Sequence, residues 1–351
     1  MATLFVALLC FMNTTGAMAG KKNLIVDTDL FSDVDDAGAL LLAATSPDVN
    51  LLAVNINSRS SYSALAVSAI LSHYGKDKVP IGILRPLTNA TFFDSWSYEL
   101  GEYASKVAFH FSGASLPWGH ADDAWDPVAL YRKVLAEAQD NSVTIASIGF
   151  LDNLSALLNS TSDSYSNLTG RDLVAQKVNE LVVMGGKYPS GRSWNFWGSD
   201  PSLAAHVINT WDGRVVFVGG DVGKQVLSGG PLMVKGPKKD PVRMAYIYYS
   251  YYAPRPSWDP LTILYAIHGL GDLFELGNEY GYNHVHPDGT NEWVWDENVR
   301  SQHFLRLKVD NQTAAGEVDR LLLQGALMVS KGHVGTLARE ASCDLCRHEE
   351  L

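Results

Sequence analysis

The chain has 351 residues, with 27 Lys and Arg against 38 Asp and Glu, which gives a formal net charge of −11. This balance argues against a nucleic acid as the partner, because binding a phosphate backbone needs a basic patch. The length allows one large α/β domain or two smaller ones.

The N-terminus has the pattern of a secretory signal peptide. An apolar run at residues 4–12 is too short to span a bilayer, and Ala17-Met18-Ala19 supplies a small-x-small cleavage site. We therefore expect residues 1–19 to be removed and the mature chain to start near Gly20. No later apolar run is long enough for a membrane helix, so we predict a secreted, extracellular protein without a membrane partner.

Glycosylation motifs fit this route. We predict a glycoprotein in which the acceptors are Asn89, Asn159, Asn167 and Asn311, each followed two residues later by Thr. Asn153 also matches the motif, but it begins an apolar helix and is expected to be buried. Cys343 and Cys346 lie in a polar tail at 341–351, and they are too few for a zinc site. A surface disulfide and two free thiols both remain open.

Strands and helices are expected to alternate along the chain. A strand at 23–27 precedes a helix at 33–44, followed by a strand at 49–56, a helix at 62–74 and a strand at 79–83. Residues 84–124 are irregular. Next come a helix at 126–139 opened by Asp126-Pro127, a strand at 143–148, a helix at 152–158 and a strand at 180–184. A helix at 201–210 and a strand at 214–218 precede helices at 241–252 and 259–267. Residues 292–295 and 303–309 resemble a hairpin or edge strands, and the last helix is at 313–324.

This alternation predicts an α/β fold with a mostly parallel central sheet flanked by helices, in one domain over residues 20–340. In such sheets, ligands bind outside the carboxyl ends of the strands. Polar and glycine-rich segments follow the predicted strands at 27–36, 55–61, 147–153, 184–186 and 219–221. We therefore expect one shared site at this edge.

The most acidic of these segments holds five carboxylates in ten residues: Asp27, Asp29, Asp33, Asp35 and Asp36. Like charges at close range repel each other by several kcal/mol when the dielectric is low, and no Lys or Arg lies within the segment. A hard divalent cation with oxygen ligands is the natural compensation. Within the cluster, Asp33 is expected to cap the helix or face solvent rather than bind a metal.

Several of these segments together resemble the inosine/uridine-preferring nucleoside hydrolase family. The segment 25–36 resembles the longer form of its acidic turn, and Ser147–Leu154, Val182–Gly186, Asn195–Ala205 and Trp258-Asp259-Pro260 follow in the order of the family's other motifs. The resemblance covers residues 23–270. It implies a nucleoside hydrolase-like fold with a Rossmann-like core, and a purine or pyrimidine nucleosidase.

The resemblance also implies roles for individual residues. Ca²⁺ would be bound by Asp29, Asp35, Asp36, Asp259 and the backbone carbonyl of Ile148. Asp29 would be the catalytic general base on a metal-bound water, with Asp27 behind it. Substrate-binding residues would be Asp35, Met184 and Asn195, together with Asn57 after the second strand, Trp197 and Trp258. The partner would be a small-molecule nucleoside, and a homo-oligomer is compatible with the family.

The chain departs from the family pattern at two positions. Trp258 stands where some members have a His that could protonate the leaving base, and stacking of the base on Trp258, Trp194 or Trp197 is an alternative. Ser193 stands where the family has a Glu, so recognition of the sugar 5′-hydroxyl is open, as is the base preference. His284 and His286 are expected to be exposed in a polar loop. His120, near Asp122 and Asp123, is expected in a solvated loop rather than a second metal site.

Two other functions are compatible with parts of the pattern. A secreted protein could keep the fold and bind ribosides or sugars without catalysis. A phosphatase of the haloacid-dehalogenase type also begins with a strand followed by Asp-x-Asp, but the pair Asp35-Asp36 does not fit that class.

Overall fold

The computed structural model describes residues 20–94 and 100–345, with side-chain surroundings through residue 329. The predicted signal peptide at 1–19 and the end of the chain from 346, including Cys346, lie outside the described residues. Among the described residues, no helix is both long and apolar enough to cross a membrane.

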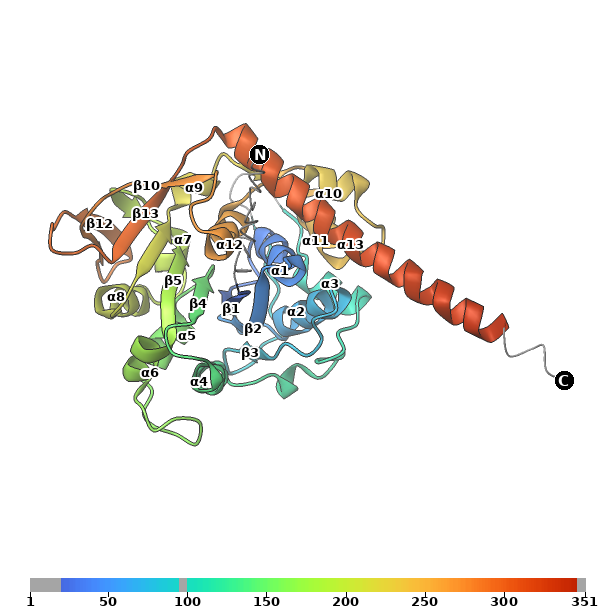
Figure 1. Cartoon of the computed structure of the whole chain (residues 1–351), viewed down its shortest axis with the longest axis horizontal. Coiled ribbons are helices and arrows are strands. Elements are labelled where there is room, and N and C mark those ends of the chain that lie inside the picture. Colours follow the sequence, from blue (N-terminus) through green and yellow to red (C-terminus); the bar gives the residue numbers. More distant parts are fainter. Residues whose placement is uncertain (1–19, 95–99, 346–351) are drawn as a thin grey trace, which may run out of the picture.

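The centre of the molecule is an eight-stranded sheet with the order β10-β13-β7-β5-β4-β1-β2-β3 (Figure 1). Its strands are parallel except β10, which pairs antiparallel with β13. The bounds are β1 Lys22–Thr28, β2 Val49–Ile56, β3 Ile81–Ile83, β4 Val143–Ser147, β5 Val178–Met184, β7 Val215–Val218, β10 Phe274–Leu276 and β13 Gln302–Leu307. The predicted α/β fold with a mostly parallel sheet is confirmed.

The sheet is buried on both faces, and β1 illustrates why its sequence is a continuous apolar run. Leu24 and Val26 belong to one hydrophobic core, whereas Ile25, between them, belongs to the other. Successive strand residues point to opposite faces, so a strand with a core on each side needs apolar residues throughout.

Helices cover both faces (Figure 1). One core is closed by α1 Asp35–Thr45, α2 Ser61–His73, α3 Ala104–His110, α10 Gly230–Lys235, α11 Pro241–Ser250, α12 Trp258–His268 and α13 Asn311–Leu345. The other is closed by α4 Pro127–Glu137, α5 Asp152–Leu158, α6 Gly170–Lys177 and α8 Pro201–Thr210. Short helical turns complete the set: η1 Ala121–Asp123, α7 Trp194–Trp197 and α9 Gly220–Gly223.

Three helices start at an Asp-Pro pair, as predicted for the first of them. The Asp126 carboxylate accepts hydrogen bonds from the backbone of α4, and Asp200 and Asp240 do the same for α8 and α11. The following proline has no N–H to leave unsatisfied and its φ is already helical. These starts fix where each helix enters the fold.

The C-terminal part differs from the prediction. Residues 292–295 and 303–309 do not form a hairpin: β12 Thr290–Val294 pairs with β11 Tyr282–Val285 and β6 Ser190–Arg192 in a separate sheet, while β13 lies inside the main sheet. His284 is therefore in a strand, not a loop. A further two-stranded sheet joins β8 Leu227–Ser228 and β9 Arg255–Pro256.

The last helix is longer than predicted, and α11 is shorter. α13 continues to Leu345 because no proline follows residue 324, and its glycines weaken a helix by only about 1 kcal/mol each without ending it. Residues 341–345 of the predicted polar tail are thus helical. α11 stops at Ser250 because Tyr251 and Tyr252 adopt left-handed φ values of 51° and 71°.

Candidate active site

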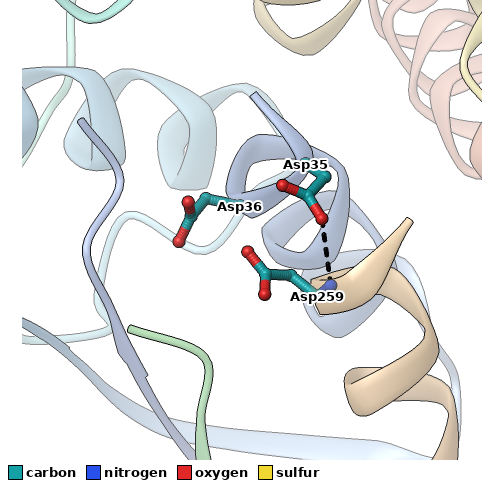
Figure 2. Close-up of side chains that lie close together, drawn as sticks. All are labelled: Asp35, Asp36 and Asp259. Atoms are coloured by element: carbon teal, nitrogen blue, oxygen red, sulfur yellow. Dashed lines mark hydrogen bonds between the residues drawn. The ribbon is translucent and has the colours of Figure 1, made fainter. Parts of the chain in front are cut away.

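Three buried carboxylates converge between the first turns of two helices. Asp35 and Asp36 begin α1 directly after the loop that follows β1, and Asp259 lies in the first turn of α12 (Figure 2). One oxygen from each lies within 4.8 Å of the others. The Asp259 backbone N–H donates to Asp35 Oδ2 at 3.0 Å, so the two helix starts are joined at this point. Helix N-termini favour negative charge, which explains why both turns are acidic.

Asp29 lies beside this group and is 4% exposed. Its carboxylate accepts a hydrogen bond from Ser32 Oγ at 3.1 Å, and its charge contributes to raising the pKa values of Asp36 and Asp259. Burial raises the pKa of Asp29 itself to about 7. The chain thus brings the four predicted carboxylates into one electrostatically coupled group.

The pKa values of Asp35, Asp36 and Asp259 are raised well above the ordinary carboxyl value, first by burial and then by the neighbouring carboxylates. Such a group is costly to ionise unless a positive charge is added. A set of buried carboxylate oxygens at this spacing fits a hard divalent cation. The donor set therefore suits a metal of the calcium or magnesium type.

Arg255 is the basic side chain that lowers the pKa of Asp35, and it forms an ion pair with Asp33. Its Nη2 lies 2.6 Å from Asp33 Oδ2, and the guanidinium is 5% exposed. The other Asp33 oxygen accepts from the Val34 N–H at 2.7 Å. Asp33 therefore does not cap α1, whose N-cap is Val34, and its carboxylate does not simply face solvent. It forms an ion pair with Arg255 instead.

Aromatic residues surround this ion pair. The Arg255 guanidinium lies 5.1 Å from the centre of the Tyr249 ring, and Tyr249 Oη donates to Asp94 at 2.7 Å. Tyr103 Oη donates to the Asp33 carbonyl at 2.6 Å. We call Asp33, Arg255, Tyr103 and Tyr249 the clasp. Its members other than Asp33 were missed by sequence reasoning, because no local pattern connects residues so far apart in the chain.

Beneath Asp29, the fully buried Asp27 is held by three donors. Tyr131 Oη lies 2.7 Å from Oδ2, Asn57 Nδ2 lies 2.6 Å from Oδ1, and Asn153 Nδ2 lies 3.2 Å from Oδ2. Burial still raises the Asp27 pKa to about 7. Asn57 Oδ1 accepts the Phe150 N–H at 3.1 Å, so both ends of the Asn57 amide bind the protein itself.

Gly149 is required for this close packing. A Cβ at this position would lie 2.4 Å from the Asp29 nitrogen and 2.8 Å from Asn57 Oδ1. The turn after β4 can therefore approach the acidic loop only with glycine here. That approach brings the Ile148 carbonyl to the edge where the loop after β1 begins.

Asn195, on the short helix α7, connects two strand ends. Its Nδ2 donates to the carbonyl of Ile148 at 2.9 Å and to that of Met184 at 3.1 Å. Asn195 is 7% exposed and Met184 is 8% exposed. Ser193, which stands in place of the family's Glu, accepts a hydrogen bond from the Gly186 N–H through its Oγ at 2.6 Å, so this oxygen is occupied by the backbone.

The two tryptophans predicted to bind substrate, Trp258 and Trp197, lie in different surroundings. The indole N–H of Trp258 donates to the Gly220 carbonyl at 2.7 Å, which ties the start of α12 to α9 next to Asp259. Trp197 is 38% exposed, and its ring lies against Arg192 and Trp194. The described contacts of Trp197 do not include the acidic group. His120 lies against Asp123 on the surface, as expected.

Comparisons with known proteins identify the family of this chain. Residues 24–335 match the family described as inosine-uridine preferring nucleoside hydrolase. A probable uridine nucleosidase 2 from Arabidopsis thaliana is 23% identical over 222 residues, which span 60% of this chain and 63% of that relative.

Solved structures share the fold. A plant nucleoside hydrolase has a TM-score of 0.64 at 18% identity, covering 86% of this chain and 99% of that one. An inosine-uridine preferring nucleoside hydrolase from Bacillus anthracis has a TM-score of 0.60, also at 18% identity and with the same coverage. The family match extends beyond residue 270, where the sequence resemblance stopped, and the chain belongs to the inosine-uridine preferring nucleoside hydrolase family.

Proposed function

We propose that this protein hydrolyses the N-glycosidic bond of ribonucleosides to free base and ribose. The observation that carries the proposal is the convergence of Asp35, Asp36 and Asp259, with Asp29 beside them, at the carboxyl edge of a parallel sheet. This is where such sheets bind ligands. Membership of the family removes the phosphatase alternative.

We propose Ca²⁺ as the metal, held by Asp29, Asp35, Asp36, Asp259 and the Ile148 carbonyl. Oxygen ligands in flexible number suit Ca²⁺, and Asn195 occupies one side of the Ile148 carbonyl while leaving its second lone pair. When bound, the cation would lower the pKa of a water molecule and orient it.

Asp29 is our candidate for the general base. Burial raises the pKa of this carboxyl to about 7 in the absence of a metal. A cation next to it would lower this pKa and keep Asp29 ionised, which is the form that accepts a proton. Ser32 Oγ and the support of Asp27 from below would hold the carboxylate in place.

The sugar would lie above the carboxylates. Breaking an N-glycosidic bond develops positive charge on the sugar ring, as in glycoside hydrolysis generally. Buried carboxylates stabilise that charge because the surrounding dielectric is low. We propose that Asp35 accepts hydrogen bonds from ribose hydroxyls and that Met184 and Asn195 line the sugar pocket.

The side chain of Trp258 offers the leaving base a ring surface rather than a donor, because its indole N–H is bonded to the Gly220 carbonyl. We propose a contact of this kind and assign no leaving-group acid. Trp197 remains a weaker candidate for the pocket, since its described contacts lie with Arg192 and Trp194.

We also propose that the protein is secreted and glycosylated. The support is the signal-peptide pattern in the sequence and the exposure of the four predicted acceptors Asn89, Asn159, Asn167 and Asn311. Asn153, expected to be buried, is 0% exposed and hydrogen-bonds Asp27. Enzymatic removal of glycans from secreted protein, followed by mass spectrometry, would test these sites.

The function is tested by measuring free ribose released from inosine, uridine, adenosine, guanosine and cytidine, with and without EDTA. Release that EDTA abolishes and Ca²⁺ restores supports the proposal and ranks the bases. Absence of release from every nucleoside, with Ca²⁺ bound, would overturn it in favour of a protein that binds ribosides without cleaving them.

A further inference from the structure

The outer face of the small sheet carries two imidazoles and a carboxylate that the proposed reaction does not use. His284 lies in β11, His286 follows directly after it, and Glu292 lies in β12, the strand labelled in Figure 1. Residues two apart on a strand share a face. Asn283 and Val285, which alternate with the histidines, are buried, so both imidazoles lie on the outer face.

The three side chains are close to one another. His284 is directly opposite Glu292 in the strand register, a position at which side chains contact each other. His286 Nε2 lies 3.4 Å from Glu292 Oε1, and the two imidazole centres are 4.8 Å apart. Two of the three groups therefore already touch, and the third is their neighbour on the same surface.

The backbone that carries these groups is fixed. His286 N–H donates to the Thr290 carbonyl at 2.8 Å, and Gly289 N–H donates to the His286 carbonyl at 2.9 Å. Gly289 supplies the left-handed φ of 81° that this tight turn needs. The hairpin is also anchored from within by Asn291, which bonds Lys187 and Asn283. Little ordering of the chain is therefore left for a ligand to provide.

We propose that His284, His286 and Glu292 form a Zn²⁺ site on this hairpin. Two imidazole nitrogens and one carboxylate oxygen are a ligand set that zinc accepts, with water in the fourth position. As the side chains stand, the three ligand atoms are not all within 4.8 Å of one another, so the proposed site requires His284 to rotate about its side-chain bonds. The His286 and Glu292 side chains are 41% and 55% exposed, which leaves space for the ion and its water.

This site differs chemically from the acidic group. Asp35, Asp36 and Asp259 offer oxygen only and suit a hard cation, whereas imidazole nitrogen selects zinc and related transition metals. The two sites also lie in different parts of the fold: the acidic group is at the starts of α1 and α12, whereas β11 and β12 belong to the separate three-stranded sheet. The zinc site can therefore be tested independently of the proposed nucleoside hydrolysis.

The test is calorimetric titration of the full chain with Zn²⁺ in excess Ca²⁺, using protein without a histidine tag. We expect the double variant His284→Gln/His286→Gln to bind Zn²⁺ at least about tenfold more weakly, because two of its three protein ligands are removed. His120→Gln is the matched control, since His120 is another exposed histidine next to a carboxylate, and its Zn²⁺ affinity should equal that of the unchanged protein.

A second variant keeps the proposal testable if the double variant folds poorly. Glu292→Gln leaves both imidazoles in place and should weaken Zn²⁺ binding. Zn²⁺ should therefore raise the melting temperature of the unchanged protein more than that of Glu292→Gln. Equal Zn²⁺ affinity in the unchanged protein and in folded variants would overturn the site. Absence of Zn²⁺ binding in excess Ca²⁺ would also overturn the site, because any Zn²⁺ that binds without Ca²⁺ would then be in the acidic group.

Discussion

The carboxylates of the acidic loop fall into two groups that the protein treats differently. Asp27 and Asp33 have partners within the chain: three neutral donors hold Asp27, and Arg255 pairs with Asp33. Asp35, Asp36 and Asp259 instead face one another: burial raises the pKa in both groups, but in this one the neighbouring carboxylates raise it further. The first group belongs to the frame, whereas the second would be completed by the metal that we propose.

In the function that we propose, one loop would serve as both scaffold and reaction site. Burying a charge without a partner is strongly unfavourable, so such a carboxyl either takes up a proton or is compensated by a ligand. The clasp and the Asp27 network hold the backbone on either side of Asp29, and Asp35 and Asp36 follow directly after Asp33 of the clasp.

The largest effect is expected from Asp29→Asn, which removes the proposed base while keeping the shape of the side chain. Ribose release should fall by roughly 10²–10⁴-fold, the range typical of lost general-base catalysis. Circular dichroism should show an unchanged fold. A folded, Ca²⁺-loaded variant that retains full turnover would remove Asp29 from the mechanism.

Next in size is the clasp. Arg255→Met leaves Asp33 without its cation in a largely buried position and should lower the free energy of unfolding by about 3 kcal/mol. The double variant Asp33→Asn/Arg255→Met should recover part of this loss, because the unpaired charge is then gone. Urea unfolding measures both. A single variant as stable as the unchanged protein would show that the clasp is not part of the frame.

Asp259→Ala addresses the other group. It should weaken Ca²⁺ binding by at least about tenfold, because one charged oxygen ligand is lost. Asp122→Ala, a change of an exposed carboxylate in the η1 turn, is the control and should leave Ca²⁺ affinity unchanged. Equilibrium dialysis compares the two; unchanged Ca²⁺ affinity in Asp259→Ala would contradict its role as a ligand.

The smallest effect is a pH dependence of the metal-free protein. Asp27 and Asp29 have native pKa values of about 7 against an ordinary 3.8, so between these values the native state binds protons that the unfolded state has released. Stability must then fall as pH rises through this window. The contribution of Asp163 to stability has the opposite pH dependence. Because Arg132 lowers the Asp163 pKa to about 2, this contribution changes only in more acidic solution.

In EDTA, the melting temperature should therefore be lower at pH 7.5 than at pH 5, by roughly a few degrees. Ca²⁺ should raise the melting temperature more at pH 7.5 than at pH 5, because fewer protons then have to be displaced from the carboxyl groups. A melting temperature that increases with pH in EDTA would contradict the assigned protonation states.

Sequence reasoning located the central sheet and the acidic loop because both leave local patterns. The apolar run before Asp27 predicts a buried strand, and the Asp-Pro pairs predict helix starts. It missed the clasp because Arg255 pairs with Asp33 across 222 positions of the chain. It also placed His284 in a loop, since alternating polar residues on a sheet with one solvent face resemble a polar segment.

The most direct test of the account is to titrate metal-depleted protein with Ca²⁺ and follow binding by calorimetry and ribose release in parallel. The account predicts that the two curves rise together, and that both are lost in Asp259→Ala. Ribose release at full rate before Ca²⁺ is bound would contradict the claim that the uncompensated carboxylates form a metal site on which hydrolysis depends.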